Sequence, residues 1–289
     1  MKLLLLLTVG VAAFAQAVEL KVAAVQFRSS FDIADNTKRI VAALESLADK
    51  GVAVAVFPEC AVTGYHTGPS IDATPEQLEG AAAFIGQTCA RRRIGAVVGS
   101  VFKSGSRAYN VALVFNEKGE MVERFGKLQL AGEKWATPGN HMALFELGGV
   151  PSTVIICHDE RYPEFVRLPA IAGARVVYYI SHESGMKSEQ KLPGYRAQMM
   201  ARAVENQMFA VAANAPGNNA DNSGSHGQSR IIRDDGNIIE EASIYGEDVI
   251  IATVRIKPAK LTRPLEGVTG AWWKLGLEQL LRDRGKKLE

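Results

Sequence analysis

The sequence predicts an α/β fold built as one domain, and three observations lead to that prediction. Short β-branched apolar runs alternate with amphipathic stretches of helical period along most of the 289 residues. A hydrophobic content of 47% is enough for a globular chain of this length to bury a large core. No shift in composition marks a linker. We therefore expect a single domain over residues 18–289, ending in a helical tail from about residue 270.

The first half of the chain begins with strands and helices in alternation. A helix is expected at 35–51, where an amphipathic stretch ends on a glycine. A second helix is expected at 74–93, where a Thr cap, a Pro at the first helical position and a Gln in capping-box position stand together. Apolar runs predict strands in this half at 18–27, 52–59, 94–102, 108–116 and 121–130. The strand at 121–130 is expected to form a hairpin with the strand before it.

The second half continues the alternation. Helices are expected near 163–173, after a Pro-Glu start, and near 193–206. An Asp-Gly turn at 235–236 predicts a hairpin within 229–242. Buried apolar runs predict further strands at 154–156, 174–180, 208–214 and 247–256. The alternation does not by itself fix the order of the strands.

The N-terminus has the pattern of a secretory signal peptide. A lysine at position 2 precedes an apolar run at 3–11, and Ala15-Gln16-Ala17 provides a small-x-small site. We expect cleavage after Ala17 and export to the periplasm or the medium. The alternative is an apolar N-terminal strand or an anchor, but the run is too short to span a bilayer.

Export changes the interpretation of the cysteines. An exported chain with three cysteines leaves at least one thiol free. Cys60 and Cys89 are able to pair, while the helical pattern around Cys89 favours a core position for it. The remaining thiol is Cys157.

Charge and motif content exclude several classes of partner. The formal net charge of +2 carries no basic stripe, so nucleic acid is not expected as a partner, and neither is a membrane once the signal peptide is removed. The five histidines lack paired metal-ligand spacing, and the Gly/Asn/Ser-rich loop at 217–227 has no lysine. We therefore predict no metal and no cofactor.

Three polar residues stand in unusual positions in the predicted strands. Cys157 ends the run at 154–156, Glu59 ends the run at 52–59, and Lys127 interrupts an otherwise apolar stretch. Such strand ends are where ligands collect in α/β sheets. A glutamate can take a thiol proton, and a lysine together with the N–H after the nucleophile can stabilise an oxyanion. Alternatively, the three are a core cysteine, a turn residue and a solvated lysine.

Three sequence blocks, "VAVAVFPECAVTGY", "FGKLQL…GEKWATPGN" and "CHDERYPEFVRLPAIAGA", resemble the signature blocks of the nitrilase, or carbon–nitrogen hydrolase, superfamily. They occur in that family's order, with Glu, Lys and Cys in turn. "RAQMMARAVENQMFAVAANAPG" resembles the helix and strand that follow. The resemblance extends from about residue 21 to about residue 256.

The resemblance implies a fold and a set of roles. The fold is a four-layer α-β-β-α sandwich with mixed sheets. Cys157 is implied as nucleophile, Glu59 as general base and Lys127 as the oxyanion-stabilising group. Glu133 matches a second glutamate that places the water or the substrate.

Family members also form homodimers or higher homo-oligomers, and this chain is expected to do so. Trp272 and Trp273 in the tail then have two possible places, at a partner surface or against their own domain.

The turn after Cys157 resembles the amidase and N-carbamoyl amino acid hydrolase branches more than the nitrile-cleaving members. Arg161 matches a position that binds a substrate carboxylate, for which a guanidinium is well suited, or else it pairs within the turn. His158 and His182 depart from the usual residues and are candidate substrate contacts, although His182 also fits a loop hydrogen bond.

The expected reaction is thiol-dependent hydrolysis of a small linear amide or N-carbamoyl compound, releasing ammonia or an amine. Nitrile hydrolysis, acyl transfer by the same cysteine, and a non-catalytic ligand-binding homologue remain as alternatives.

Overall fold

The computed structural model describes residues 16–65, 72–183, 192–218 and 224–258. Most of the predicted signal peptide, and the predicted tail with Trp272 and Trp273, lie outside these ranges. Within them, no helix is both long enough and apolar enough to cross a lipid bilayer.

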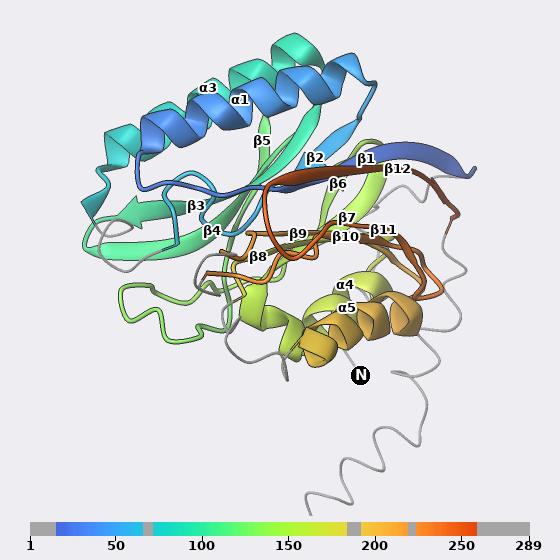
Figure 1. The fold of residues 1–289 in the computed structure, drawn as a ribbon. Coiled ribbons are helices and arrows are strands. Elements are labelled where there is room, and N and C mark those ends of the chain that lie inside the picture. Colours follow the sequence, from blue (N-terminus) through green and yellow to red (C-terminus); the bar gives the residue numbers. More distant parts are fainter. Residues whose placement is uncertain (1–15, 66–71, 184–191, 219–223, 259–289) are drawn as a thin grey trace, which may run out of the picture.

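Two six-stranded mixed sheets face each other (Figure 1). The first has, in spatial order, β12 (Asp248–Ile256), β1 (Val18–Gln26), β2 (Val54–Val56), β3 (Gly95–Ser104), β4 (Arg107–Phe115) and β5 (Met121–Gly126). The second has β11 (Ile238–Glu241), β10 (Arg230–Ile232), β9 (Phe209–Asn214), β8 (Val176–Ser181), β7 (Val150–Ile156) and β6 (Phe145–Leu147). In each sheet the central strands pair in parallel and the outer strands pair antiparallel.

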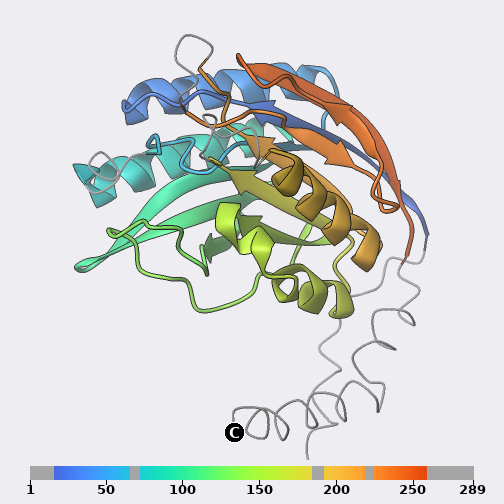
Figure 2. The same cartoon turned by 60° about the horizontal axis from the view of Figure 1, so that its bottom comes forward.

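Helices cover the outer face of each sheet. Helices α1 (Ile33–Asp49) and α3 (Pro75–Arg92) lie on the first sheet, and α4 (Glu164–Ile171) and α5 (Leu192–Asn206) lie side by side on the second (Figures 1 and 2). A short 3₁₀ helix, η1 (Cys157–Arg161), joins β7 to α4. The predicted four-layer α-β-β-α sandwich is confirmed.

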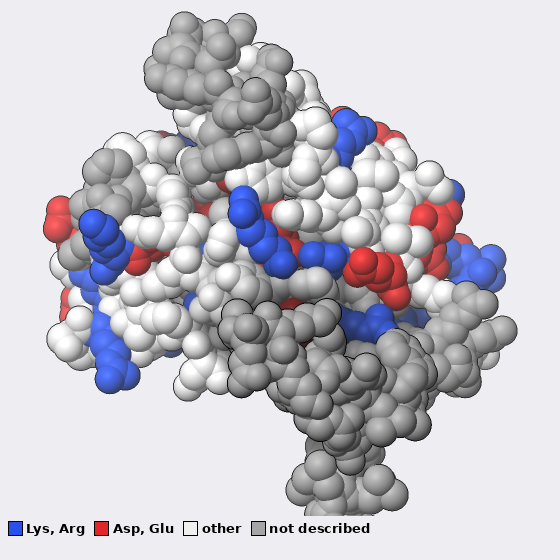
Figure 3. Space-filling model, turned by 90° about the horizontal axis from the view of Figure 1, so that it is seen from below, with Lys and Arg blue, Asp and Glu red and all other residues white. Residues whose placement is uncertain are grey.

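Acidic and basic side chains are interspersed with uncharged surface on the side of α4 and α5 (Figure 3). The described part of this face therefore shows no patch of a single sign.

Local sequence signals set the helix starts. At α3, Thr74 and Gln77 form the predicted capping box. At α1, the side chain of Asp32 accepts hydrogen bonds from the N–H groups of Ala34 and Asp35, at 2.8 and 3.1 Å. This cap starts α1 two residues before the predicted position.

The core has three layers because alternate strand residues face opposite ways. One apolar cluster fills the space between the sheets, and one lies under each helix pair. On β8, Tyr178 belongs to the cluster between the sheets, whereas Tyr179 belongs to the cluster under α4 and α5. Neighbouring residues on one strand therefore reach two different layers of the core.

One strand prediction needs correction, and one strand was missed. The strand predicted at 121–130 ends at Gly126, since the N–H groups of Leu128 and Gln129 turn away to the carboxylate of Asp159. Strand β6 was not predicted, because three residues are too few to show a period.

The possible pairing of Cys60 with Cys89 is wrong, and both thiols are free. Cys89 packs in the core under α1 and α3, as the helical pattern favoured, and Cys60 packs in a separate cluster with Leu78 and Val101.

Candidate active site

The structure brings the polar residues predicted at strand ends together between the two sheets. Glu59 follows β2 in the first sheet, and Cys157 follows β7 in the second. Lys127 directly follows β5, and its Nζ lies 2.8 Å from Glu59 Oε1 and also pairs with Glu133. We call Glu59, Lys127 and Glu133 the Lys127 cluster; its three side chains are at most 2% exposed.

Every charge in the Lys127 cluster has partners. Glu59 accepts hydrogen bonds from Asn110 Nδ2 at 2.7 Å and from the backbone N–H of His182 at 2.8 Å. Glu133 accepts from the hydroxyl of Tyr65 at 3.0 Å and from the N–H of Ala131. Buried charges are stable only when paired and hydrogen-bonded in this way.

The pKa values follow from this pairing. Burial alone lowers the pKa of Lys127, but the negative charges of Glu59 and Glu133 outweigh it and raise that pKa. Burial raises the pKa of Glu133, but Lys127 outweighs it and the net shift is downward. Lys127 therefore stays an ammonium, which is the form that stabilises an oxyanion.

Cys157 sits at a strained turn at the start of η1. Its φ of +47° is in the left-handed region, which a residue with a Cβ occupies only when its surroundings hold it there. Burial and the charge of Glu59 raise the pKa of its thiol, although Lys127 lowers it. The resting group is the thiol, so a base must take its proton before it attacks.

Asp159 ties the two halves of the site together. Its carboxylate accepts from the N–H of Gln129 at 2.7 Å, of Ile156 at 3.1 Å and of Leu128 at 3.2 Å. These bonds join the end of β7 to the segment after Lys127. Asp159 therefore fixes Cys157 relative to Lys127.

Gly99 on β3 allows the turn with Glu59 to approach closely. A Cβ at Gly99 would lie 2.2 Å from the carbonyl oxygen of Pro58 and 2.5 Å from the backbone nitrogen of Cys60. Only glycine leaves room for that crossing.

His182 is the predicted substrate contact that the structure places in the site. Its ring stacks on Tyr65, with centroids 4.7 Å apart and planes 15° apart. Burial, and then the charge of Lys127, lower its pKa to about 4, so the ring is neutral at pH 7. Its Nδ1 is buried and has no hydrogen-bond partner among the described residues.

His158 and Arg161 lie differently. The half-exposed ring of His158 packs edge-on against Tyr162, with centroids 5.9 Å apart. Arg161 is exposed; its guanidinium lies 5.7 Å from the ring centre of Tyr195 and its Nη2 lies 3.4 Å from the hydroxyl. The structure thus directs Arg161 toward α5, and the substrate roles of both residues stay predictions.

Residues 21–264 match the family model for carbon–nitrogen hydrolase. The chain belongs to the carbon–nitrogen hydrolase family. It is therefore an enzyme that hydrolyses C–N bonds other than peptide bonds in a thiol-dependent reaction.

The relatives agree with the family assignment. The 2-oxoglutaramate amidase of Bacillus subtilis is 32% identical over 193 residues, which cover 65% of this chain and 73% of the relative. The "hydrolase in agr operon" of Staphylococcus aureus is 26% identical over 82% of this chain and 90% of its own. The crystal structure of an amidase from Nesterenkonia sp. superposes with a TM-score of 0.74 at 24% identity, covering 82% of this chain and 90% of that one.

Two residues that hold this hydrolase's Lys127 cluster were not predicted. Tyr65 follows the Glu59 turn, and only the fold shows that it reaches Glu133. Asn110 could have been predicted, because it is an amide within an otherwise apolar run. In the structure it is fully buried in β4. A buried polar side chain in a strand usually serves a specific partner.

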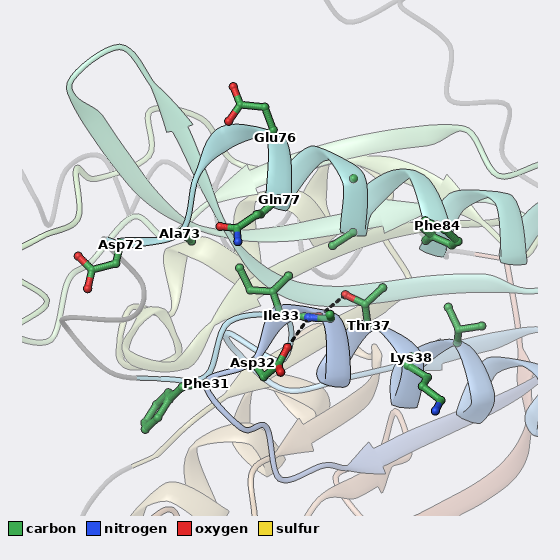
Figure 4. A pocket seen from close by; sticks show the side chains of 14 residues that line it. Phe31, Asp32, Ile33, Thr37, Lys38, Asp72, Ala73, Glu76, Gln77 and Phe84 are labelled. Atoms are coloured by element: carbon green, nitrogen blue, oxygen red, sulfur yellow. Dashed lines mark hydrogen bonds between the residues drawn. The ribbon is translucent and has the colours of Figure 1, made fainter.

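A groove of about 1010 Å³ lies elsewhere on the hydrolase, between α1 and α3 (Figure 4). Phe31, Ile33 and Phe84 help to line it. Glu59, Lys127 and Cys157 do not line this groove, so the groove is separate from the candidate active site.

Within the described residues, no group of three or more His, Cys, Asp or Glu side chains is arranged to hold a metal ion.

Proposed function

We propose that this hydrolase cleaves a small linear amide or N-carbamoyl compound, with Cys157 as nucleophile, Glu59 as general base and Lys127 as oxyanion stabiliser. The observation that carries the proposal is the sealed Lys127 cluster. It sets an ionised ammonium and a carboxylate beside a strained cysteine whose thiol feels both charges. Such preorganised charge in a dry site is the usual source of large rate enhancements.

The first half of the reaction forms a thioester. Cys157 Sγ bonds to the carbonyl carbon while its proton passes to Glu59, and the carbonyl electron pair moves to oxygen. Lys127 Nζ, with the backbone N–H of His158, stabilises that oxyanion. When the intermediate collapses, the C–N bond breaks and the leaving amine takes the proton from Glu59.

The second half returns the free enzyme. Water attacks the thioester carbon and gives its proton to Glu59, and the Cys157 sulfur leaves and recovers that proton. Glu133, held by Lys127 and Tyr65, places the water or the substrate at the reacting carbon. The raised pKa of the thiol supports this order, because the cysteine holds its proton until Glu59 removes it.

An amide is favoured over a nitrile as substrate. Named relatives such as the 2-oxoglutaramate amidase act on amides, and the turn after Cys157 resembles the amidase branches. The stacked rings of Tyr65 and His182 provide a flat wall, and His182 Nδ1 is free to hydrogen-bond the substrate. Arg161 is assigned to a substrate carboxylate, and this role requires it to leave Tyr195.

The proposal also includes export through the peptide 1–17 and assembly into a homodimer or larger homo-oligomer. Terminal sequencing of the secreted or periplasmic product should begin at Val18, and light scattering should give at least twice the chain mass. An uncleaved cytoplasmic product, or a monomer, would contradict these two parts.

A substrate panel tests the reaction. Primary amides, N-carbamoyl amino acids and nitriles are incubated with the protein, and ammonia release is followed. We expect release from at least one amide or carbamoyl compound, loss of release in Cys157→Ala, and no loss in the matched control Cys89→Ser. Release from nitriles alone, or release that survives Cys157→Ala, would overturn the proposal.

A further inference from the structure

A second buried polar cluster lies behind Cys157, on the face of β8 that turns toward α4 and α5. It consists of Tyr179, Glu183, His226 and Glu160, and we call it the Tyr179 cluster. Each of the four is at most 4% exposed. Its members belong to β8, the turn after β8, the segment before β10, and η1.

The cluster reaches the backbone of Cys157 through Tyr179. The Tyr179 hydroxyl donates to the carboxylate of Glu183 and lies 3.4 Å from the carbonyl oxygen of Cys157. Glu183 is held in turn by His226, whose Nε2 lies 2.6 Å from Glu183 Oε2. The N–H of Glu183 also donates to Asn214 Oδ1 at 3.2 Å. The hydroxyl therefore bonds mainly to Glu183, and the Cys157 carbonyl oxygen is its weaker second acceptor.

The Cys157 carbonyl and the His158 N–H belong to one peptide unit. That unit is planar and trans, so the two groups point in opposite directions. With the carbonyl directed at Tyr179, the His158 N–H points to the other side. This N–H belongs to the first turn of η1, where the helix offers it no acceptor.

The strain at Cys157 makes this anchor important. A φ of +47° is unfavourable for cysteine, so the unit relaxes unless contacts hold it. A donor on the carbonyl oxygen also polarises the peptide and strengthens its N–H as a donor.

We propose that Tyr179, held by Glu183 and His226, is a positioning residue that aims the His158 N–H at the oxyanion of the tetrahedral intermediate. The inference rests on the proposed function, since it needs an acyl-transfer oxyanion at Cys157. It adds residues on the far face of β8 to the site.

The test compares Tyr179→Phe with Tyr178→Phe. Both remove one hydroxyl from β8, but Tyr178 lies between the sheets, where its ring stacks on Phe145. Three quantities are measured for each: kcat and KM on the best amide of the panel, and the rate at which iodoacetamide alkylates Cys157. Alkylation displaces iodide and forms no oxyanion, so it reports on the thiol and not on the His158 N–H.

For Tyr179→Phe we expect kcat to fall about tenfold, less than the loss of a whole oxyanion donor, with KM and alkylation unchanged. Tyr178→Phe should keep all three near the wild-type values. An equal fall of kcat and alkylation would mean a displaced cysteine and would overturn the inference, as would an unchanged kcat.

Glu183→Gln provides a second variant if Tyr179→Phe proves unstable. Glutamine retains an acceptor for the hydroxyl, so kcat should fall by about threefold or less, again with alkylation unchanged. A larger loss of kcat than in Tyr179→Phe would contradict the proposal that Glu183 acts through Tyr179. A wild-type chain that turns over no amide overturns the proposed function, whereas active wild type with unaffected Tyr179→Phe overturns only this inference.

Discussion

The Lys127 cluster and the Tyr179 cluster are both buried beside Cys157, yet they handle charge differently. In the first, the carboxylates of Glu59 and Glu133 both pair with the ammonium of Lys127, and each accepts a further hydrogen bond from its own donor. In the second, the charge of Glu183 acts on Glu160, His226 lies beside Glu183, and Glu160 Oε2 has no hydrogen-bond partner among the described residues.

The difference appears in the pKa directions of the second cluster. Burial, followed by the charge of Glu183, raises the pKa of Glu160 well above its ordinary value. Burial also opposes ionisation of Glu183, but His226 outweighs it and lowers that pKa. The two pKa values are therefore shifted in opposite directions, with Glu160 favouring its protonated form and Glu183 its ionised form. The Lys127 cluster is therefore arranged to keep charges for chemistry, and the Tyr179 cluster to hold a structure.

Replacing one carboxyl in each cluster should give the largest contrast. Glu59→Gln should lower kcat by about 10²- to 10⁴-fold, since it removes the base while keeping the side-chain shape. Glu160→Gln mimics the protonated form toward which burial shifts Glu160, and should change kcat by less than about threefold. Steady-state kinetics on one amide measure both. Equal losses would erase the distinction between the clusters.

Removing the shared ammonium should have the next largest effect. Lys127→Met leaves Glu59 and Glu133 buried without their cation, which should lower the free energy of unfolding by about 3–5 kcal/mol. Lys134→Met, on the exposed surface of the same loop, is the matched control. Urea unfolding compares them. A stable Lys127→Met protein would show that the two carboxylates do not depend on Lys127.

The pH dependence of stability should show a smaller effect at His182. Its pKa is lowered from 6.5 to about 4, so the unfolded chain binds a proton in this window that the folded chain does not. The free energy of unfolding should therefore fall by about 3 kcal/mol as pH drops from 6.5 to 4. His182→Asn should flatten that part of the profile, whereas His141→Gln on the surface should not. Parallel profiles for all three proteins would refute this assignment.

Much of the fold and of the Lys127 cluster was accessible from sequence. Long apolar runs and the Thr74 cap carry strong local signals, and these predictions hold in the structure. Cys157 and Glu59 end buried apolar runs and Lys127 interrupts an apolar stretch, which made them conspicuous before any contact was known.

The partners of these residues depend on how distant segments meet. Tyr65 reaches Glu133 across 68 positions of sequence, and Tyr179 reaches Cys157 across 22. No local period encodes such contacts. Arg161 illustrates the same limit, because its direction is set by the approach of α5 rather than by its own turn.

Trapping the acyl-enzyme tests the role of Cys157 most directly. Wild-type protein is quenched in acid during turnover of its best amide, and tryptic peptides are weighed. We expect an added acyl mass on the peptide that ends at Arg161 and contains Cys157, none on the single peptide 51–91 that carries both Cys60 and Cys89, and none in Cys157→Ala. Turnover with an acyl group on another cysteine, or turnover that persists in Cys157→Ala, would contradict the assignment of Cys157 as the nucleophile.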